Sequence, residues 1–131
     1  MRVGIFSAKP YDIDHFDRIN QTFGLQIEYF DYRLCLQTVR LAHGFDAVCA
    51  FVNDSLGDEV LTELSKNGTK VIAMRCAGFN NVDLAAAKRL NLKVVNVPSY
   101  SPESVAEHTV ALMLTLNRKV HKAYQRTRDA N

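Results

Sequence analysis

The sequence has no tryptophan, few cysteines and almost no excess of charge of either sign. Cys35, Cys49 and Cys76 are an odd number without CxxC spacing, so they indicate neither a disulfide framework nor a zinc site. Reduced thiols in a cytoplasmic setting are the simpler interpretation. The 16 Lys and Arg residues are nearly balanced by 14 Asp and Glu residues. So small an excess gives no reason to expect nucleic acid or an anionic membrane as a partner.

Long apolar runs and closely spaced glycines are also missing. No apolar run approaches the roughly 20 residues of a membrane-spanning helix, and the chain begins without the pattern of a signal peptide. We therefore expect a soluble protein that is not exported. The six glycines never fall two positions apart, so the sequence contains neither GxGxxG nor GxxxxGK(S/T). A standard cradle for a dinucleotide or a triphosphate is therefore not expected.

Short β-branched or aromatic segments alternate with longer amphipathic segments along the 131 residues. This alternation is typical of βαβ units and a parallel sheet, and the length suits one domain. The predicted fold class is an α/β, flavodoxin-like, doubly wound parallel sheet of five strands, in an order that the sequence does not give. Strands are predicted at 2–6, 25–30, 45–52, 69–74 and 92–97, and helices at 12–23, 34–42, 58–66 and 84–90.

A final helix is predicted from Pro102 to near Arg128, and it is the longest predicted element. Ser101 can serve as its N-cap, with Pro102 at the first position and Glu103 in the first turn. Its centre, residues 110–114, is apolar on all sides, which implies burial on more than one face. A long helix of this kind suggests a partner that the sequence itself does not supply.

In an open parallel sheet, ligands bind outside the carboxyl ends of the strands. The turn after Met74 contains Gly78 and leads into a helix, an arrangement that points backbone N–H groups at an anion such as a carboxylate. The alternative is an ordinary turn that needs glycine for its backbone angles, and the sequence alone favours this alternative. The loop at 98–102 offers Tyr100 beside a second helix N-terminus, where helix capping explains the pattern about equally well.

Other candidate sites are weaker. Asp54 follows the third predicted strand, as the phosphate-accepting Asp does in receiver domains, but residues 6–9 lack the acidic side chains that such a site needs for Mg²⁺. The same loop lacks the Ser- and Thr-rich phosphate cradle of an FMN site. The four histidines have no metal-ligand spacing.

Two separated segments resemble one enzyme family. Residues 75–83 read RCAGFNNVD and residues 94–108 read VVNVPSYSPESVAEH. Together they closely resemble the D-isomer-specific 2-hydroxyacid dehydrogenases, above all the bacterial fermentative, NAD-dependent D-lactate dehydrogenases. The resemblance extends over essentially the whole chain, and two motifs in the right order make it much more specific than either turn alone.

The resemblance implies that residues 1–131 form the substrate, or catalytic, domain of a longer cytoplasmic enzyme that reduces pyruvate to D-lactate with NADH. The backbone amides around Ala77 and Gly78 would hold the carboxylate of the 2-oxo or 2-hydroxy acid. Tyr100 would line the substrate pocket beside Phe51. Val105 would approach the nicotinamide of NAD from the start of the long helix.

By the same resemblance, the Rossmann domain that binds NAD is absent from this chain, and residues 102–131 begin the helix that leads to it and contributes to homo-oligomer contacts. The family's proton-transferring histidine, its acidic partner and its substrate-clamping arginine are expected beyond Asn131, so no catalytic residue is assigned. The histidines that do not match are His15, His43, His108 and His121. The isolated chain is therefore expected to be inactive. The alternative function is a stand-alone flavodoxin-like module that binds a carboxylate or a partner.

Overall fold

The structure is a computed structural model that describes residues 1–99 and 101–129. Its contacts divide the chain into two compact units, Met1–Pro98 and Ser99–Asn131. The first unit contains the sheet with the helices packed on it, and the second contains two helices. The turn with Ala77 and Gly78 and the loop with Phe51 therefore belong to the first unit.

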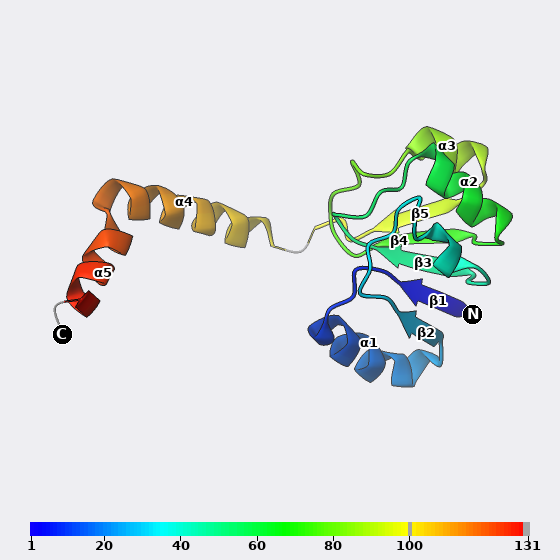
Figure 1. Ribbon diagram of the computed structural model, residues 1–131, viewed down its shortest axis with the longest axis horizontal. Coiled ribbons are helices and arrows are strands. Elements are labelled where there is room, and N and C mark those ends of the chain that lie inside the picture. Colours follow the sequence, from blue (N-terminus) through cyan, green and yellow to red (C-terminus); the bar gives the residue numbers. More distant parts are fainter. Residues whose placement is uncertain (100, 130–131) are drawn as a thin grey trace. The chain divides into compact units, whose positions relative to one another are not determined.

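Five parallel strands form the sheet of the first unit in the order β2-β1-β3-β4-β5 (Figure 1). This is the order of flavodoxin-like doubly wound sheets, which confirms the predicted fold class. The winding reverses between β1 and β3, and ligands of such sheets bind outside the carboxyl ends of the strands near this reversal. The strands lie inside the predicted segments: β1 (Arg2–Ile5), β2 (Gln26–Tyr29), β3 (Ala47–Ala50), β4 (Val71–Met74) and β5 (Lys93–Asn96).

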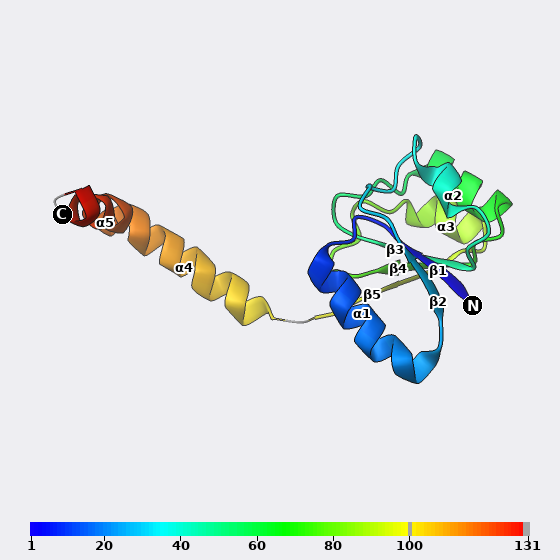
Figure 2. The same cartoon turned by 60° about the horizontal axis from the view of Figure 1, so that its bottom comes forward.

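Helices cover both faces of the sheet. α1 (Pro10–Phe23) lies on one face, whereas α2 (Asp58–Lys66) and α3 (Leu84–Arg89) lie on the other (Figure 1 and Figure 2). α1 begins two residues before the predicted start, because proline suits the first helical position. The backbone N–H of Lys9 donates to Oδ2 of Asp12 over 2.9 Å and so completes this helix start.

Two apolar cores lie on the two faces of the sheet. The larger core joins the sheet to α2 and α3 and includes the fully buried Leu61 and Ile72. The smaller core lies on the other face and includes Ile5 and Cys49, with Phe16 of α1 packed against it. All four residues of β3 are buried, as expected for a central strand covered on both sides. These cores fix the strand ends from which the loops of the site begin.

The prediction of a helix at 34–42 is wrong for residues 34–38. Only the 3₁₀ helix η1 (Val39–Ala42) forms there. Oγ1 of Thr38 accepts a hydrogen bond from the backbone N–H of Cys35 (3.0 Å) and donates one to the carbonyl of Arg33 (2.6 Å). These side-chain bonds take the place of α-helical backbone bonds in this segment.

The second unit contains α4 (Pro102–Arg118) and α5 (Val120–Asp129). The single helix predicted from Pro102 to near Arg128 is therefore divided at Lys119, whose φ of 53° and ψ of 38° are left-handed and end an α-helix. Neither helix buries a described residue within this unit, so the burial predicted for residues 110–114 is not supplied by the unit itself. Among the described residues, no helix is both long and apolar enough to cross a bilayer.

Candidate functional site

The loops that follow β1, β3 and β4 meet at the carboxyl edge of the sheet. Immediately beyond the strands, the N–H of Phe6 donates to the carbonyl of Cys49 (2.9 Å) and the N–H of Arg75 to that of Ala50 (3.0 Å). Farther out, Leu56 and Val82 form an isolated parallel bridge between the loops after β3 and β4. The loop with Phe51 and the turn with Ala77 and Gly78 are therefore held side by side.

Gly78 is not required by the backbone angles of its turn. The φ angle of Gly78 lies outside the left-handed range in which Gly24, Gly44 and Gly68 are found. A Cβ atom built on Gly78 meets no atom of this chain within 4 Å. A left-handed backbone conformation therefore does not explain the glycine at position 78, and the residue leaves open space beside the turn.

The turn is fixed through its carbonyl groups and keeps its N–H groups available. The carbonyl of Ala77 accepts a hydrogen bond from Nδ2 of Asn96 (2.8 Å), and that of Gly78 accepts one from the thiol of Cys76 (3.2 Å). Burial raises the pKa of Cys76 and so keeps its thiol protonated as the donor. Among the described residues, no protein acceptor binds the N–H of Ala77 or Gly78. Two adjacent backbone donors of this kind can bind a carboxylate.

The helix that follows the turn is short and its start is partly capped. α3 has only six residues, and Oδ1 of its N-cap Asp83 already accepts the N–H of Ala86 over 2.9 Å. The sequence argument placed a carboxylate at this turn, where it leads into the start of the helix. Among the described residues, the structure leaves the N–H groups of Ala77 and Gly78 in that turn without a protein acceptor.

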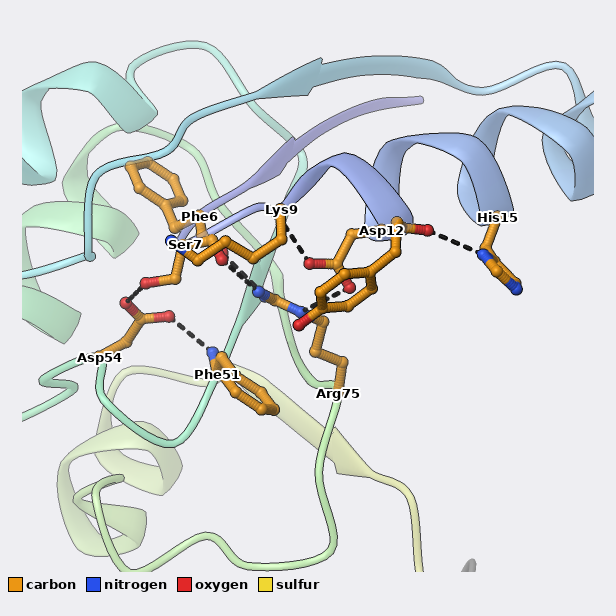
Figure 3. A network of polar contacts seen from close by, with 9 residues as sticks. Phe6, Ser7, Lys9, Asp12, His15, Phe51, Asp54 and Arg75 are labelled. Atoms are coloured by element: carbon orange, nitrogen blue, oxygen red, sulfur yellow. Dashed lines mark hydrogen bonds and ion pairs between the residues drawn. The ribbon is translucent and has the colours of Figure 1, made fainter. Parts of the chain in front are cut away.

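Phe51 is held at its backbone and at its ring (Figure 3). Its N–H donates to Oδ2 of Asp54 (2.6 Å), and its carbonyl accepts from Nδ2 of Asn81 (3.0 Å). The guanidinium carbon of Arg75 lies 4.7 Å from the centroid of the Phe51 ring, within the range of a cation–π contact. An aromatic side chain is thus fixed in place beside the turn that carries the backbone donors.

Asp54 organises the loops from a buried position. Its carboxylate is 2% exposed and accepts hydrogen bonds from the hydroxyl of Ser7 (2.7 Å) and the N–H of Leu34 (2.8 Å), besides that of Phe51. The sequence argument considered this residue only as a phosphate acceptor and disfavoured that role. The structure shows a carboxylate whose lone pairs are engaged by the protein, which is a structural role that sequence reasoning missed.

Arg75 is a second residue whose role sequence reasoning missed. Its Nη1 donates to the carbonyl of Phe6 (2.8 Å) and its Nη2 to that of Ser7 (2.7 Å), while Nε lies 3.6 Å from Oδ1 of Asp12. These partners are more than 60 positions away in the sequence. In the sequence, Arg75 was noticeable only as the first residue of the motif at 75–83. Figure 3 shows the guanidinium between Asp12 and the loop of Phe51.

The structure does not test the other predicted site residues. Tyr100 lies outside the described residues. Val105 lies near the start of α4 in the second unit, and its carbonyl accepts a hydrogen bond from Oγ1 of Thr109 (2.8 Å). Across residues 1–99 and 101–129, no three His, Cys, Asp or Glu side chains converge as they would to hold a metal ion.

A family model for the catalytic domain of D-isomer specific 2-hydroxyacid dehydrogenases matches residues 3–131. The chain belongs to this family. It is 56% identical over 131 residues to D-lactate dehydrogenase of Escherichia coli and 53% identical to a 2-hydroxyacid dehydrogenase homolog of Haemophilus influenzae. In both comparisons all of this chain is matched, but only 40% of the relative. The chain therefore spans well under half the length of these curated relatives.

Solved structures of the family agree with the fold over the same portion. The apo-structure of Escherichia coli D-lactate dehydrogenase superposes with a TM-score of 0.86 and 56% identity, covering 100% of this chain and 42% of that one. The pyruvate reductase of Chlamydomonas reinhardtii has a TM-score of 0.86 and 42% identity, covering 100% and 39%. D-lactate dehydrogenase of Aquifex aeolicus, complexed with NAD and lactic acid, has a TM-score of 0.80 and 28% identity, covering 98% and 38%.

The turn after β1 does not have the features of a dinucleotide cradle. In a Rossmann domain the pyrophosphate of NAD is bound by backbone N–H groups of the first strand-to-helix turn. Here the N–H groups of Ser7 and Ala8 in that turn already donate to the carbonyls of Tyr32 and Phe30, each over 2.8 Å. The glycine spacing of a cradle is also missing. The turn after β1 is therefore not assigned as a binding site for the pyrophosphate of NAD.

Proposed function

We propose that this chain is the substrate domain of an NAD-dependent D-lactate dehydrogenase, which reduces pyruvate to D-lactate with NADH. The observation that carries the proposal is the pair of backbone donors at Ala77 and Gly78, which have no acceptor among the described residues and lie beside the ring of Phe51. Relatives named D-lactate dehydrogenase, which match the whole chain at about half identity, support the same assignment.

In this proposal the amides of Ala77 and Gly78 bind the carboxylate of pyruvate or D-lactate. Hydrogen bonds to an ionised acceptor are stronger than neutral ones, and the open space beside Gly78 admits the acid close to the backbone. Phe51 forms one wall of the pocket for the substrate side chain, and Tyr100 forms another. These residues bind and orient the acid, and none of them transfers a proton.

The remaining functions belong to parts of the enzyme outside these residues. We propose that NAD is bound mainly by a separate Rossmann domain, because the turn after β1 has no N–H groups to offer it, and that Val105 approaches the nicotinamide. The proton-transferring groups are placed outside the chain as well, so that residues 1–131 alone are inactive. We further propose that the apolar residues of α4 contribute to homo-oligomer contacts. Free thiols at all three cysteines suit a cytoplasmic protein.

The experiment that tests this function begins with the size of the native protein. An antibody raised against residues 1–131 should detect, in the source cells, a protein more than twice the mass of this 14.8 kDa chain. That protein, once purified, should oxidise NADH when pyruvate is added, whereas the 131-residue chain should not. A native protein of about 15 kDa without this activity would refute the proposal and favour a carboxylate-binding module without redox chemistry.

A further inference from the structure

Each nitrogen of the Arg75 guanidinium has a partner within the protein. Its Nη1 and Nη2 each donate to a backbone carbonyl of the loop after β1, and its Nε faces Asp12. The side chain of Arg75 is only 12% exposed and that of Asp12 only 13%. Arg75 is therefore poorly placed to bind a substrate carboxylate, although it stands beside the candidate site and carries the matching charge.

The central carbon of the same guanidinium lies over the ring of Phe51. The backbone of Phe51 is already fixed by Asp54 at the N–H and by Asn81 at the carbonyl. Those two bonds leave the side-chain torsions of Phe51 free. The ring is held by its packing against the larger core and by the contact of 4.7 Å with Arg75. Arg75 is held in turn by partners in the loop after β1 and on α1, so the orientation of the ring depends on how these segments are placed.

We propose that Arg75 is a positioning residue: it fixes the ring of Phe51 in the orientation that sets how large a 2-oxo acid the pocket accepts. This inference rests on the proposed function, in which Phe51 forms a wall of the substrate pocket. A ring that can rotate away enlarges the pocket, so larger acids gain access while pyruvate loses its close contact. Arg75 acts through Phe51 and touches no reacting atom.

A lysine cannot replace Arg75 in this role. The two carbonyls of Phe6 and Ser7 are bound by the two terminal nitrogens of one planar group, and the central carbon of that group lies over the Phe51 ring. Lysine carries a compact charge on a flexible stem and can neither bridge both carbonyls in one plane nor stack on the ring in the same way.

The test measures substrate preference in the complete enzyme that contains this chain. Initial rates with NADH give kcat/KM for pyruvate and for the larger 4-methyl-2-oxopentanoate, and the ratio of the two values is compared among variants. We expect Arg75→Met to lower this ratio about 10-fold, the discrimination typical of a small change in an apolar pocket. Arg75→Lys should lower it as well. Arg89→Met removes another arginine that pairs with an aspartate, Asp58, on the exposed surface, and it should leave the ratio unchanged.

A double-mutant cycle separates positioning from a general structural defect. If Arg75 acts through Phe51, then Arg75→Met should change the ratio little once Phe51→Ala is present, because interacting residues are not additive. Equal effects of Arg75→Met in both backgrounds would overturn the inference. An equal fall in kcat/KM for both acids, with the ratio unchanged, would overturn it too. If Arg75→Met does not fold, Arg75→Lys, which keeps a charge beside Asp12, takes its place in the cycle.

A failure of the proposed function can be told apart from a failure of this inference. If the unaltered enzyme reduces neither acid with NADH, the proposed function and the preference that depends on it are both wrong. If the enzyme reduces pyruvate but Arg75→Met and Arg75→Lys keep the original ratio, only the role of Arg75 is wrong. NMR of ring-labelled phenylalanine adds an independent readout, in which the Phe51 signals should shift in Arg75→Met and stay unchanged in Arg89→Met.

Discussion

Oδ2 of Asp54 accepts a hydrogen bond of 2.6 Å from the backbone N–H of Phe51, and the aspartate is 2% exposed. The same carboxylate also accepts hydrogen bonds from Ser7 and Leu34, so one buried side chain ties together the loops after β1, β2 and β3. An aromatic wall residue of the candidate site is thereby coupled to the stability of the fold.

Replacement of this carboxylate should therefore destabilise the protein. In Asp54→Asn, an NH₂ group replaces one of the two acceptor oxygens. Depending on the orientation of the amide, the protein loses either the bond from the N–H of Phe51 or the bonds from Ser7 and Leu34. Loss of a buried, charge-assisted hydrogen bond costs roughly 2–3 kcal/mol. Urea denaturation followed by far-UV circular dichroism measures the loss. Asp58→Asn, at an exposed aspartate paired with Arg89, should cost less than about 1 kcal/mol, and equal losses in the two variants would contradict the role of Asp54.

Gly78→Ala should impair substrate binding without impairing folding. An added Cβ meets nothing within 4 Å in this chain, so the free energy of unfolding should change by less than about 0.5 kcal/mol. In the complete enzyme the methyl group occupies the space that faces the two backbone donors, and KM for pyruvate should rise by about 10-fold or more, which corresponds to about 1.4 kcal/mol. Gly57→Ala, at another glycine with open space around it but away from the turn, should leave KM unchanged. An unchanged KM in Gly78→Ala would argue against carboxylate binding at this turn.

Cys35 should react with alkylating agents before the other two cysteines. A hydrogen bond with Thr38 lowers the pKa of Cys35, and burial raises the pKa values of Cys49 and Cys76. At pH 7–8 a larger fraction of Cys35 is therefore the reactive thiolate. Mass spectrometry after brief treatment with iodoacetamide at several pH values gives the rate for each site. Thr38→Val should move the pH dependence of Cys35 alkylation upward, and equal rates at all three cysteines would contradict the prediction.

The break between α4 and α5 gives a separate test in the second unit. Lys119 adopts left-handed backbone angles, which cost a residue with a side chain about 1 kcal/mol relative to glycine. Lys119→Gly should therefore preserve or increase helix stability. Ala111→Gly, inside α4, should weaken it by about 1 kcal/mol. Cα chemical shifts along residues 101–129 report both effects, and a loss of helix around residue 119 in Lys119→Gly would indicate one continuous helix instead.

Local patterns in the sequence predicted most of the fold. α2 was predicted with its observed bounds, because acidic residues at its start and the Asn67–Gly68 pair at its end are local signals. The strands were also placed correctly, since each is a short apolar run between turns. The segment before η1 was predicted as helix because the competition from the Thr38 side chain is not visible in a hydrophobic pattern. Lys119 gave no signal either, because lysine is a residue that favours helices.

The candidate site could be predicted only in part. Gly78 was located by its place after a strand, but its backbone angles and the open space around it depend on three-dimensional structure. The roles of Arg75 and Asp54 come in part from partners in the loop after β1, far away in the sequence. Such contacts follow from the strand order, and the strand order was the one feature of the sheet that the sequence left open.

The most direct test of the central claim is the stereochemistry of the product. The complete enzyme that contains this chain is incubated with pyruvate and NADH, and the lactate formed is separated by chiral chromatography. The account predicts D-lactate, in an amount equal to the NADH oxidised. The formation of L-lactate, or the absence of any NADH-dependent reduction of pyruvate, would contradict it.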